Sequence, residues 1–344
     1  MDAGRFLRQE LVIDLHNDTI VAHQRLGNAS LAQPGLHYGD DRNGSVAGPY
    51  GHLRPATGGE RLQLDLVRMA EAGLDAGLFA VDVTLACNHH LSYALDALGY
   101  LLNDLDRSEQ GDLVRKPGDI ERLWAEGRRG VLMHVENADV TDKSLNVLRA
   151  LYALGVRSLG LTHNVSSCAA DGCMEARQGT GLTHFGKRLV REMNRLGMVV
   201  DLAHVSPRAF YEALEVSDRP VLFSHGNAQA LCDHPRNLSD HQLRALAQQG
   251  GVIGLSWVPS FVDPERATLS RLLDHFDHVV ATAGITSVAL GSDMDGGGTL
   301  LPDVFGLGDL VGGLSDRGWD EEALRLVLGG NALRVLERAL VPQV

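Results

Sequence analysis

Cysteine is scarce in this sequence, with four residues among 344, and none of them lies in a Cys-x-x-Cys pair. So low a content is typical of a protein from a reducing compartment and argues against a fold held together by disulfides. Cys168 and Cys173 lie close together in the segment SSCAADGC. We expect both of them to be free thiols.

Long apolar runs are also missing. No segment approaches the ~20 apolar residues that cross a bilayer. The opening segment MDAGRFLRQE has no apolar run of signal-peptide length, and the closing segment ERALVPQV has no anchor-like tail. From these absences we expect a cytoplasmic protein that does not bind a membrane.

Basic residues are outnumbered, with 31 lysines and arginines against 44 aspartates and glutamates, which gives a formal net charge of -13. This excess argues against nucleic acid or an anionic membrane as the main partner. Hydrophobic residues make up 44% of the chain, which is enough to bury one large core. We therefore expect a single domain over residues 1–344.

Short apolar runs recur along the chain, each followed by a helix-like stretch. They are leucine-rich or β-branched and nearly continuous, as strands buried on both faces should be. The eight runs cover residues 11–18, 76–83, 130–137, 158–164, 198–205, 220–226, 251–258 and 287–294. This alternation predicts an α/β fold of the (β/α)8 TIM-barrel type, with an open doubly wound sheet as the alternative.

Two of the intervening segments carry clear helix signals. Residues 184–196 place apolar side chains on one face, with Thr183 as the expected N-cap and Gly197 just past the end. Ser239 and Gln242 have the spacing of a capping box at the start of a second helix.

A long excursion, at about residues 27–60, follows the first run and is rich in Gly, Pro, Asn and Asp. Long ordered loops are often functional. We expect this one to form a flap near the mouth of the barrel, and a mobile surface loop is the alternative.

His16 and Asp18 lie two positions apart at the end of the first run, so a strand would point both side chains the same way. Alone, this pair is equally typical of an ordinary polar strand end. Six of the eight runs, however, end in residues that bind metals or move protons. They are His16, Asp18, His134, Glu136, His163, Asp201, His204, His225, Asp293 and Asp295.

In a barrel these strand ends surround one mouth, where barrel enzymes hold their active sites. Burying so many ionisable groups together without a cation would be costly. Three histidines, an aspartate and a glutamate suit zinc or a similar divalent ion. Five ligands exceed the three that one catalytic zinc usually takes from protein. They fit two metals ~3.5–4 Å apart that share a carboxylate.

Six motifs follow one another at a specific spacing: DLHND, HVENAD, LTHN, GLTHFGKRLVREMNRLGMVVDLAHVS, SHGNAQALCDHPRNLSD and GSDMDG. In these motifs the chain resembles the membrane (renal-type) dipeptidase family, peptidase family M19 of the amidohydrolase superfamily. The resemblance runs from VIDLHND to GGNALRVLERAL, which is nearly the whole chain.

The resemblance implies two divalent ions, most often zinc. One would take His16, Asp18 and Glu136, and the other would take Glu136, His204 and His225, so that Glu136 bridges them. Many relatives in the superfamily bridge with a carboxylated lysine. No lysine lies in any of the eight runs, which agrees with the glutamate-bridged branch.

The resemblance also implies roles for three further residues. His163 would polarise the scissile carbonyl and hold its developing oxyanion. Arg236 would grip the terminal carboxylate of the substrate, which suits its planar fork. Asp293 would take the proton from a bridging hydroxide and pass it to the leaving amine.

On this basis the chain is expected to be a zinc-dependent dipeptidase that cleaves small unblocked dipeptides, L-Xaa-D-Xaa dipeptides among them. Deacylation of N-acyl amino acids on the same metals is one alternative, and a catalytically inactive barrel that serves as a binding protein is another. Members of this family are often homodimers, which is an expectation for this chain as well. Eukaryotic members are secreted, lipid-anchored and disulfide-linked, and nothing in this sequence supports those features.

The remaining polar residues have simpler explanations. We expect His134 in the barrel interior or behind the ligands, and Asp201 to fix the position or tautomer of a ligand histidine. Asp14 and Asp295 are expected to be structural, and the glycines of MDGGG to form a tight turn that leaves room for substrate. Ordinary surface positions are predicted for His89, His90, His234, His241, His275 and His278.

Overall fold

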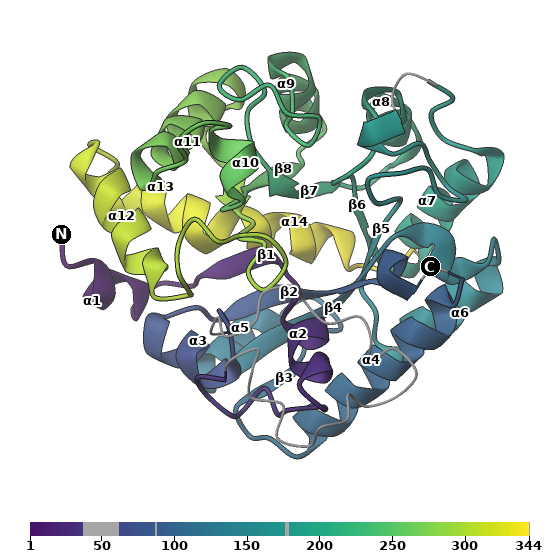
Figure 1. Cartoon of the computed structure of the whole chain (residues 1–344), viewed down its shortest axis with the longest axis horizontal. Helices are drawn as coiled ribbons and strands as arrows, with labels where there is room; N and C mark the ends of the chain where they lie inside the picture. The colour runs from purple at the N-terminus through teal and green to yellow at the C-terminus, as the bar shows by residue number, and fades with distance from the viewer. Residues whose placement is uncertain (37–61, 87, 176–178, 344) are drawn as a thin grey trace.

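Parallel strands form a closed ring that helices surround (Figure 1). The computed structural model describes residues 1–36, 62–86, 88–175 and 179–343, so most of the predicted loop at about 27–60 lies outside the described residues. The strands of the ring are β1 (Ile13–Asn17), β2 (Ala76–Asp82), β4 (Arg129–Glu136), β5 (Ser158–Gly160), β6 (Val199–Asp201), β7 (Leu222–Gly226), β8 (Val252–Leu255) and β9 (Val288–Leu290).

Neighbouring strands follow the order β2-β1-β9-β8-β7-β6-β5-β4, and a pairing between β2 and β4 closes the ring. That closing pair is in continuous parallel register from Ala76 opposite Gly130 to Asp82 opposite Glu136. The chain is therefore a (β/α)8 TIM barrel, as predicted, and the open doubly wound sheet is excluded. Each predicted run overlaps one strand of the ring.

One further strand, β3 (Gly111–Leu113), was not predicted, and it pairs with β4 outside the ring. The other helical elements are α1 (Ala3–Leu7), α2 (Thr19–Arg25), α3 (Leu66–Ala72), α4 (His90–Asp106), α5 (Asp119–Ala125), α6 (Leu145–Leu154), α7 (His184–Leu196), α8 (Pro207–Val216), α9 (Asp240–Gln248), α10 (Pro259–Val262), α11 (Leu269–Ala283), α12 (Gly306–Asp316), α13 (Glu321–Arg325) and α14 (Asn331–Ala339). Short turns of other helix types are η1 (Val83–Ala86), η2 (Ala138–Thr141), η3 (Cys173–Glu175), η4 (Ile285–Ser287) and η5 (Leu326–Gly330).

The predicted helix caps are present. The Thr183 side chain accepts a hydrogen bond from the backbone N–H of Gly186 at the start of α7, and Gly197 ends that helix in a left-handed conformation. Ser239 and Gln242 form the predicted capping box at the start of α9. These caps satisfy backbone groups that the helix itself leaves unpaired.

Helix α14 closes the end of the barrel at which the strands begin. Ile13 of β1, Leu222 of β7 and Val252 of β8 belong to one buried cluster with Ala332 and Leu336 of α14. Figure 1 shows α14, in yellow, crossing behind the strands. Because this end is packed with apolar side chains, any site must open at the opposite end, where the strands finish.

Two aspartates, the buried Asp14 and the partly buried Asp295, tie distant segments of the chain together near that open end. The carboxylate of Asp14 accepts hydrogen bonds from the backbone N–H and the hydroxyl of Ser292, at 2.7 and 2.8 Å. The carboxylate of Asp295 accepts from the backbone N–H of Gln63 and the hydroxyl of Thr19, at 2.7 and 2.8 Å. Both contacts fit the structural roles predicted for these residues.

The surface position predicted for His275 is wrong, because its side chain is buried on α11. Its Nε2 lies 2.9 Å from the carbonyl oxygen of Val262, and its Nδ1 accepts from the backbone N–H of Ala228. His275 thus joins the end of α10 to the loop after β7, and helical periodicity could not reveal those non-local partners.

The predictions about membrane-spanning segments and about free cysteines can be compared with the described part of the chain. None of its helices is long and apolar enough to cross a membrane. Cys168 and Cys173 are free thiols, as predicted.

Candidate metal centre and active site

A cavity of about 460 Å³ lies where the strands of the barrel end. Among its lining residues are all eight that the sequence singled out as ligands or catalytic groups: His16, Asp18, Glu136, His163, His204, His225, Arg236 and Asp293. They come from strands or loops that are far apart in the chain. The barrel therefore brings the whole predicted set to one place.

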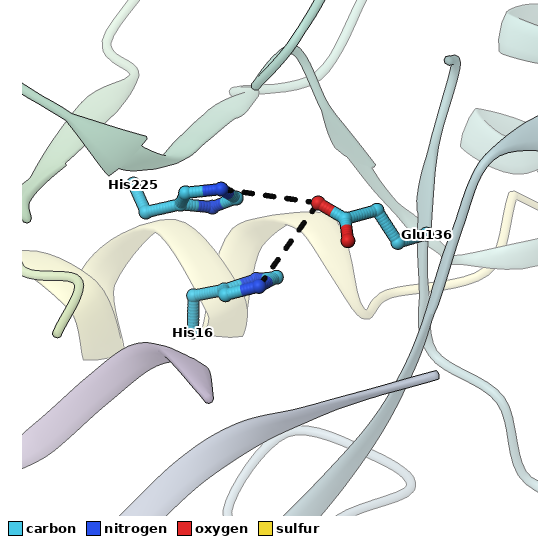
Figure 2. Close-up of side chains that lie close together, drawn as sticks. All are labelled: His16, Glu136 and His225. Atoms are coloured by element: carbon cyan, nitrogen blue, oxygen red, sulfur yellow. Dashed lines mark ion pairs between the residues drawn. The ribbon is translucent and has the colours of Figure 1, made fainter. Parts of the chain in front are cut away.

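Glu136, the last residue of β4, lies at the centre of the cluster. Figure 2 shows the rings of His16 and His225 pointing toward the same carboxylate oxygen. That oxygen, Oε1, is 3.8 Å from Nε2 of His225 and 4.0 Å from Nε2 of His16. The two rings stack with their centroids 3.8 Å apart.

The same oxygen of Glu136 lies 2.8 Å from Nε2 of His204, and Nε2 of His204 lies 3.0 Å from Nε2 of His225. On the other side, Nε2 of His16 is 3.7 Å from Oδ2 of Asp18 and 3.7 Å from Oδ1 of Asp293. Among the described residues, four overlapping groups of ligand atoms result, with the atoms of each group within 4.8 Å of one another. Glu136 belongs to two of these groups and His16 belongs to three.

The outer hydrogen bonds fix the tautomers of two histidines. Nδ1 of His204 faces Oδ1 of Asn164 at 3.0 Å, and an amide oxygen only accepts. The hydroxyl of Ser224 donates to Oδ2 of Asp201 at 2.6 Å, so it must accept from Nδ1 of His225 at 2.9 Å. Both rings therefore carry their proton on Nδ1 and turn a lone pair on Nε2 toward Glu136.

This arrangement fits a divalent cation. Two imidazole lone pairs and the buried oxygen Oε1 of Glu136 converge, and Oε1 has no hydrogen-bond partner among the described residues. Burial lowers the pKa of His204 and of His225 well below the ordinary value, so both rings stay neutral. Acceptors that face one another without a proton repel, and a cation between them removes the repulsion.

The potential around His16 is strongly negative. Burial would lower the pKa of His16, but the carboxylates of Glu136 and Asp18 outweigh it and raise the pKa to about 10. Behind this group, burial lowers the pKa of His134 to about 4, and its Nδ1 bonds the Ser158 hydroxyl. His134 thus lies in the barrel interior, as predicted. The carboxylates of Glu136 and Asp18 attract positive charge to the surroundings of His16.

Asp293 has the properties of a proton acceptor. Burial, the largest effect, and the neighbouring carboxylate of Asp18 raise the pKa of Asp293 to about 7. Its backbone is left-handed, with φ of 61°, and so is that of His204, with φ of 69°. Such conformations cost roughly 1–3 kcal/mol in a residue other than glycine and concentrate at functional sites.

The glycines after Asp293 form the predicted tight turn. The backbone N–H groups of Gly296, Gly297 and Gly298 all point to the carbonyl oxygen of Asp293, at 3.2, 2.9 and 2.7 Å. A Cβ on Gly296 would lie 2.1 Å from Oδ2 of Asp18 and 2.4 Å from Oδ1 of Asp293. Glycine is required there because the backbone itself forms part of the cavity wall.

Arg236 lies on the opposite side of the cluster, in the loop after β7. Its side chain is buried, and Nη2 donates to the carbonyl oxygen of His225 at 3.2 Å. Nε and Nη1 are also buried and have no hydrogen-bond partner among the described residues. Unpaired donors on a buried guanidinium are costly, so this arginine suits an anionic ligand.

His163 occupies the rim beside the two ligand-like histidines. Its ring stacks on that of His204 with centroids 4.1 Å apart, and its Nε2 is 3.9 Å from Oε2 of Glu136. Its side chain is 23% exposed, which leaves the ring within reach of a bound molecule. Burial lowers the pKa of His163, so the ring is neutral and can donate one hydrogen bond.

Several residues of this site were not predicted from the sequence. His234 was predicted on the surface, but it lines the cavity, and its ring lies against that of Phe261. Asn164 and Ser224, which orient the ligand-like histidines, directly follow His163 and precede His225, so adjacency was the available signal. Asp82 also lines the cavity, and its place at the end of an apolar run could have revealed it.

Comparison with known proteins gives matches over the whole fold. The family model described as membrane dipeptidase (peptidase family M19) matches residues 1–341. Dipeptidase tcpJ of Claviceps purpurea is 39% identical over 235 residues, which are 67% of this chain and 55% of that protein. Dipeptidase 3 of Mus musculus is 39% identical over 216 residues, or 60% of this chain and 44% of that protein. The chain thus spans about half the length of the curated relatives it matches.

Among solved structures, a metallopeptidase of Rhodobacter sphaeroides, crystallised with a phosphinate mimic of the dipeptide L-Ala-D-Ala, superposes with a TM-score of 0.81. It is 27% identical to this chain, and the match covers 96% of this chain and 99% of that one.

The close approach at Gly296 gives a test of the metal centre. Gly296→Ala should push the carboxylates of Asp18 and Asp293 apart. Because substitutions that disturb the support of metal ligands typically cost tenfold or more in metal affinity, Zn²⁺ binding should weaken at least roughly tenfold. Gly297→Ala is the matched control, because its Cβ would lie 3.3 Å from Asp293, a contact that a small shift relieves. Competition with a chromogenic chelator measures the affinity. Equal Zn²⁺ affinity in both variants and the unchanged protein would contradict this geometry.

Proposed function

Because this chain belongs to the membrane dipeptidase family, peptidase family M19, we propose that it is a binuclear-metal dipeptidase that hydrolyses unblocked dipeptides. The observation that carries the proposal is the convergence of the Glu136 carboxyl group and the proton-free Nε2 atoms of His204 and His225 in one cavity with the unpaired donors of Arg236. The first group suits metal ions and the second suits a free carboxylate. A dipeptide bound at its terminus would place its single peptide bond between them.

Five residues would hold the metals. We assign His16, Asp18 and Glu136 to one ion, and Glu136, His204 and His225 to the other, with zinc as the expected metal because the donors are mixed nitrogen and oxygen. When bound, two such ions polarise a carbonyl and lower the pKa of water. The bridging role of Glu136 is supported by the position of its Oε1, which lies 2.8 Å from Nε2 of His204 and 4.0 Å from Nε2 of His16.

Asp293 would move the proton. Its raised pKa makes it a base near neutral pH, and its Oδ1 lies within 3.7 Å of the His16 ring at the edge of the cluster. It would accept a proton from the attacking water and deliver that proton to the nitrogen of the departing amine. One carboxylate can serve both steps because the proton that it gains in the first is released in the second.

His163 and Arg236 would hold the substrate. A neutral His163 would donate a hydrogen bond to the carbonyl oxygen as negative charge develops there. Nε and Nη1 of Arg236 would bind the terminal carboxylate of the substrate. The L-Ala-D-Ala mimic held by the Rhodobacter sphaeroides metallopeptidase supports L-Xaa-D-Xaa dipeptides as one substrate class.

Deacylation of N-acyl amino acids stays an alternative, since those substrates also end in a carboxylate. A cytoplasmic location, a homodimer and a single domain over residues 1–344 stay predictions from the sequence and from the family resemblance.

From the proposed role of Asp293 we expect that a variant without its carboxylate binds metal but hydrolyses almost no substrate. Asp293→Asn keeps the shape of the side chain but cannot take a proton, so kcat should fall by roughly 10²–10⁴ while the metal content stays the same. In the unchanged enzyme, kcat should fall as the pH drops, because protonated Asp293 is inactive. The midpoint should lie at or below pH 7, since bound cations lower the pKa of Asp293 from about 7. Steady-state rates from pH 5 to 9 measure this, and near-normal kcat in Asp293→Asn would exclude the role.

The role of Arg236 separates a dipeptidase from a general amidase. Losing the carboxylate partner of a buried arginine costs roughly 2–5 kcal/mol, or a factor of tens to thousands in kcat/KM. Dipeptides should therefore be cleaved far faster than the matching dipeptide amides. Arg236→Met should slow dipeptides by a similar factor and leave amides nearly unchanged. Wild-type enzyme that cleaves a dipeptide and its amide equally well would overturn both the role and the dipeptidase proposal.

A further inference from the structure

Asp82 is a cavity-lining acid that the proposed mechanism does not use. It is the last residue of β2, and Oδ1 accepts hydrogen bonds from the backbone N–H and the hydroxyl of Thr84, at 2.8 and 2.6 Å. Its other oxygen, Oδ2, has no hydrogen-bond or ion-pair partner among the described residues. Thr84 thus holds the carboxylate in place and leaves one oxygen for a bound molecule.

Asp82 does not belong to the metal centre. It lies in none of the groups of ligand atoms found among the described residues. Arg25 of α2 also lines the cavity, but no ion pair joins it to Asp82 within the part of the chain that the structure describes. Asp82 therefore contributes a fixed negative charge that neither a ligand role nor a protein partner explains.

The order of the strands places this charge opposite Arg236. Around the closed ring the strands follow one another as β1, β2, β4, β5, β6, β7, β8 and β9, so β2 and β7 lie four steps apart in either direction. Arg236 is fixed to β7 through its hydrogen bond to the carbonyl of His225. A fixed anion and a fixed cation thus face each other across the metal centre.

An unblocked dipeptide is a zwitterion with the matching arrangement of charges. Its carboxylate lies beyond the peptide bond on one side, and its α-ammonium lies one carbon from the scissile carbonyl on the other. The ammonium must therefore bind close to the metal centre. Asp82 satisfies this, because it pairs directly with Glu136 in the register of β2 and β4.

We propose that Asp82 binds the α-ammonium of the substrate and makes the enzyme specific for a free amino terminus. This inference rests on the proposed dipeptidase function and deepens it, because N-acyl amino acids share the carboxylate with dipeptides but lack the ammonium. A hydrogen bond between two charged groups in a partly closed cavity is stronger than a neutral one, so its loss is measurable.

The test compares Ala-Ala with N-propionyl-alanine, in which a hydrogen replaces the ammonium, on the zinc-loaded enzyme. Asp82→Asn keeps an oxygen for Thr84 and removes the charge. It should lower kcat/KM for Ala-Ala roughly ten- to a hundredfold and leave N-propionyl-alanine nearly unchanged. Asp112→Asn on β3 is the control for net charge, because Asp112 lies outside the ring and pairs with Arg128. Metal content and Tm establish that each variant is folded and loaded.

A second measurement needs no variant. The α-amino group of a peptide has a pKa of roughly 7.7–8.0, so kcat/KM of the wild type for Ala-Ala should fall above that pH. N-propionyl-alanine should not show this fall. A shared alkaline fall for the two substrates would overturn the inference.

The other outcomes separate this inference from the function on which it rests. Equal losses on both substrates in Asp82→Asn, or no loss, would overturn the ammonium role and leave the dipeptidase proposal standing. Lys-Ala is a third substrate for the test. If Asp82→Asn slowed the cleavage of Lys-Ala but not that of Ala-Ala, Asp82 would bind a cationic side chain, and the ammonium role would be overturned. Zinc-loaded wild type that cleaves no dipeptide at all would instead reject the proposed function.

Discussion

The site depends on one electrostatic constraint, the burial of the Glu136 carboxylate against imidazole nitrogens that carry no proton. Oε1 of Glu136 lies 2.8 Å from Nε2 of His204, and Nε2 of His225 is close to both. Because Asn164 and Ser224 hold the ring protons on Nδ1, the Nε2 atoms of His204 and His225 cannot hydrogen-bond each other. Such a cluster would repel itself if it were dry, so the surrounding structure is built to hold cations.

The barrel supplies the positions that this cluster requires. Closure between β2 and β4 fixes Glu136 beside Asp82, and the packing of α14 leaves only the opposite end open. Strained left-handed backbone at His204 and Asp293 turns both side chains inward just after their strands. A rigid frame can carry this local strain because its cost is small beside the burial of the barrel core.

The sequence predicted the barrel and the members of the cluster, because apolar runs that end in His, Asp or Glu are a local signal with a direct structural meaning. It could not show which atoms meet. The pairing of Ser224 with Asp201, and the burial of His275 between the end of α10 and the loop after β7, depend on contacts between distant segments. Strand β3 was missed because three residues carry no periodicity. His234 was misplaced because nothing local separates a histidine that lines a cavity from one on the surface.

The most direct measurement of the central claim is the metal content of protein purified and then equilibrated with zinc. We expect about two zinc ions per chain and nearly complete loss of both in Glu136→Ala, because Glu136 is the one residue assigned to both proposed ions. Glu71→Ala, on the exposed face of α3, should keep two ions and serves as the matched control. Elemental analysis after gel filtration gives these numbers. A Glu136→Ala protein that keeps two ions would contradict the bridging carboxylate and the binuclear centre built on it.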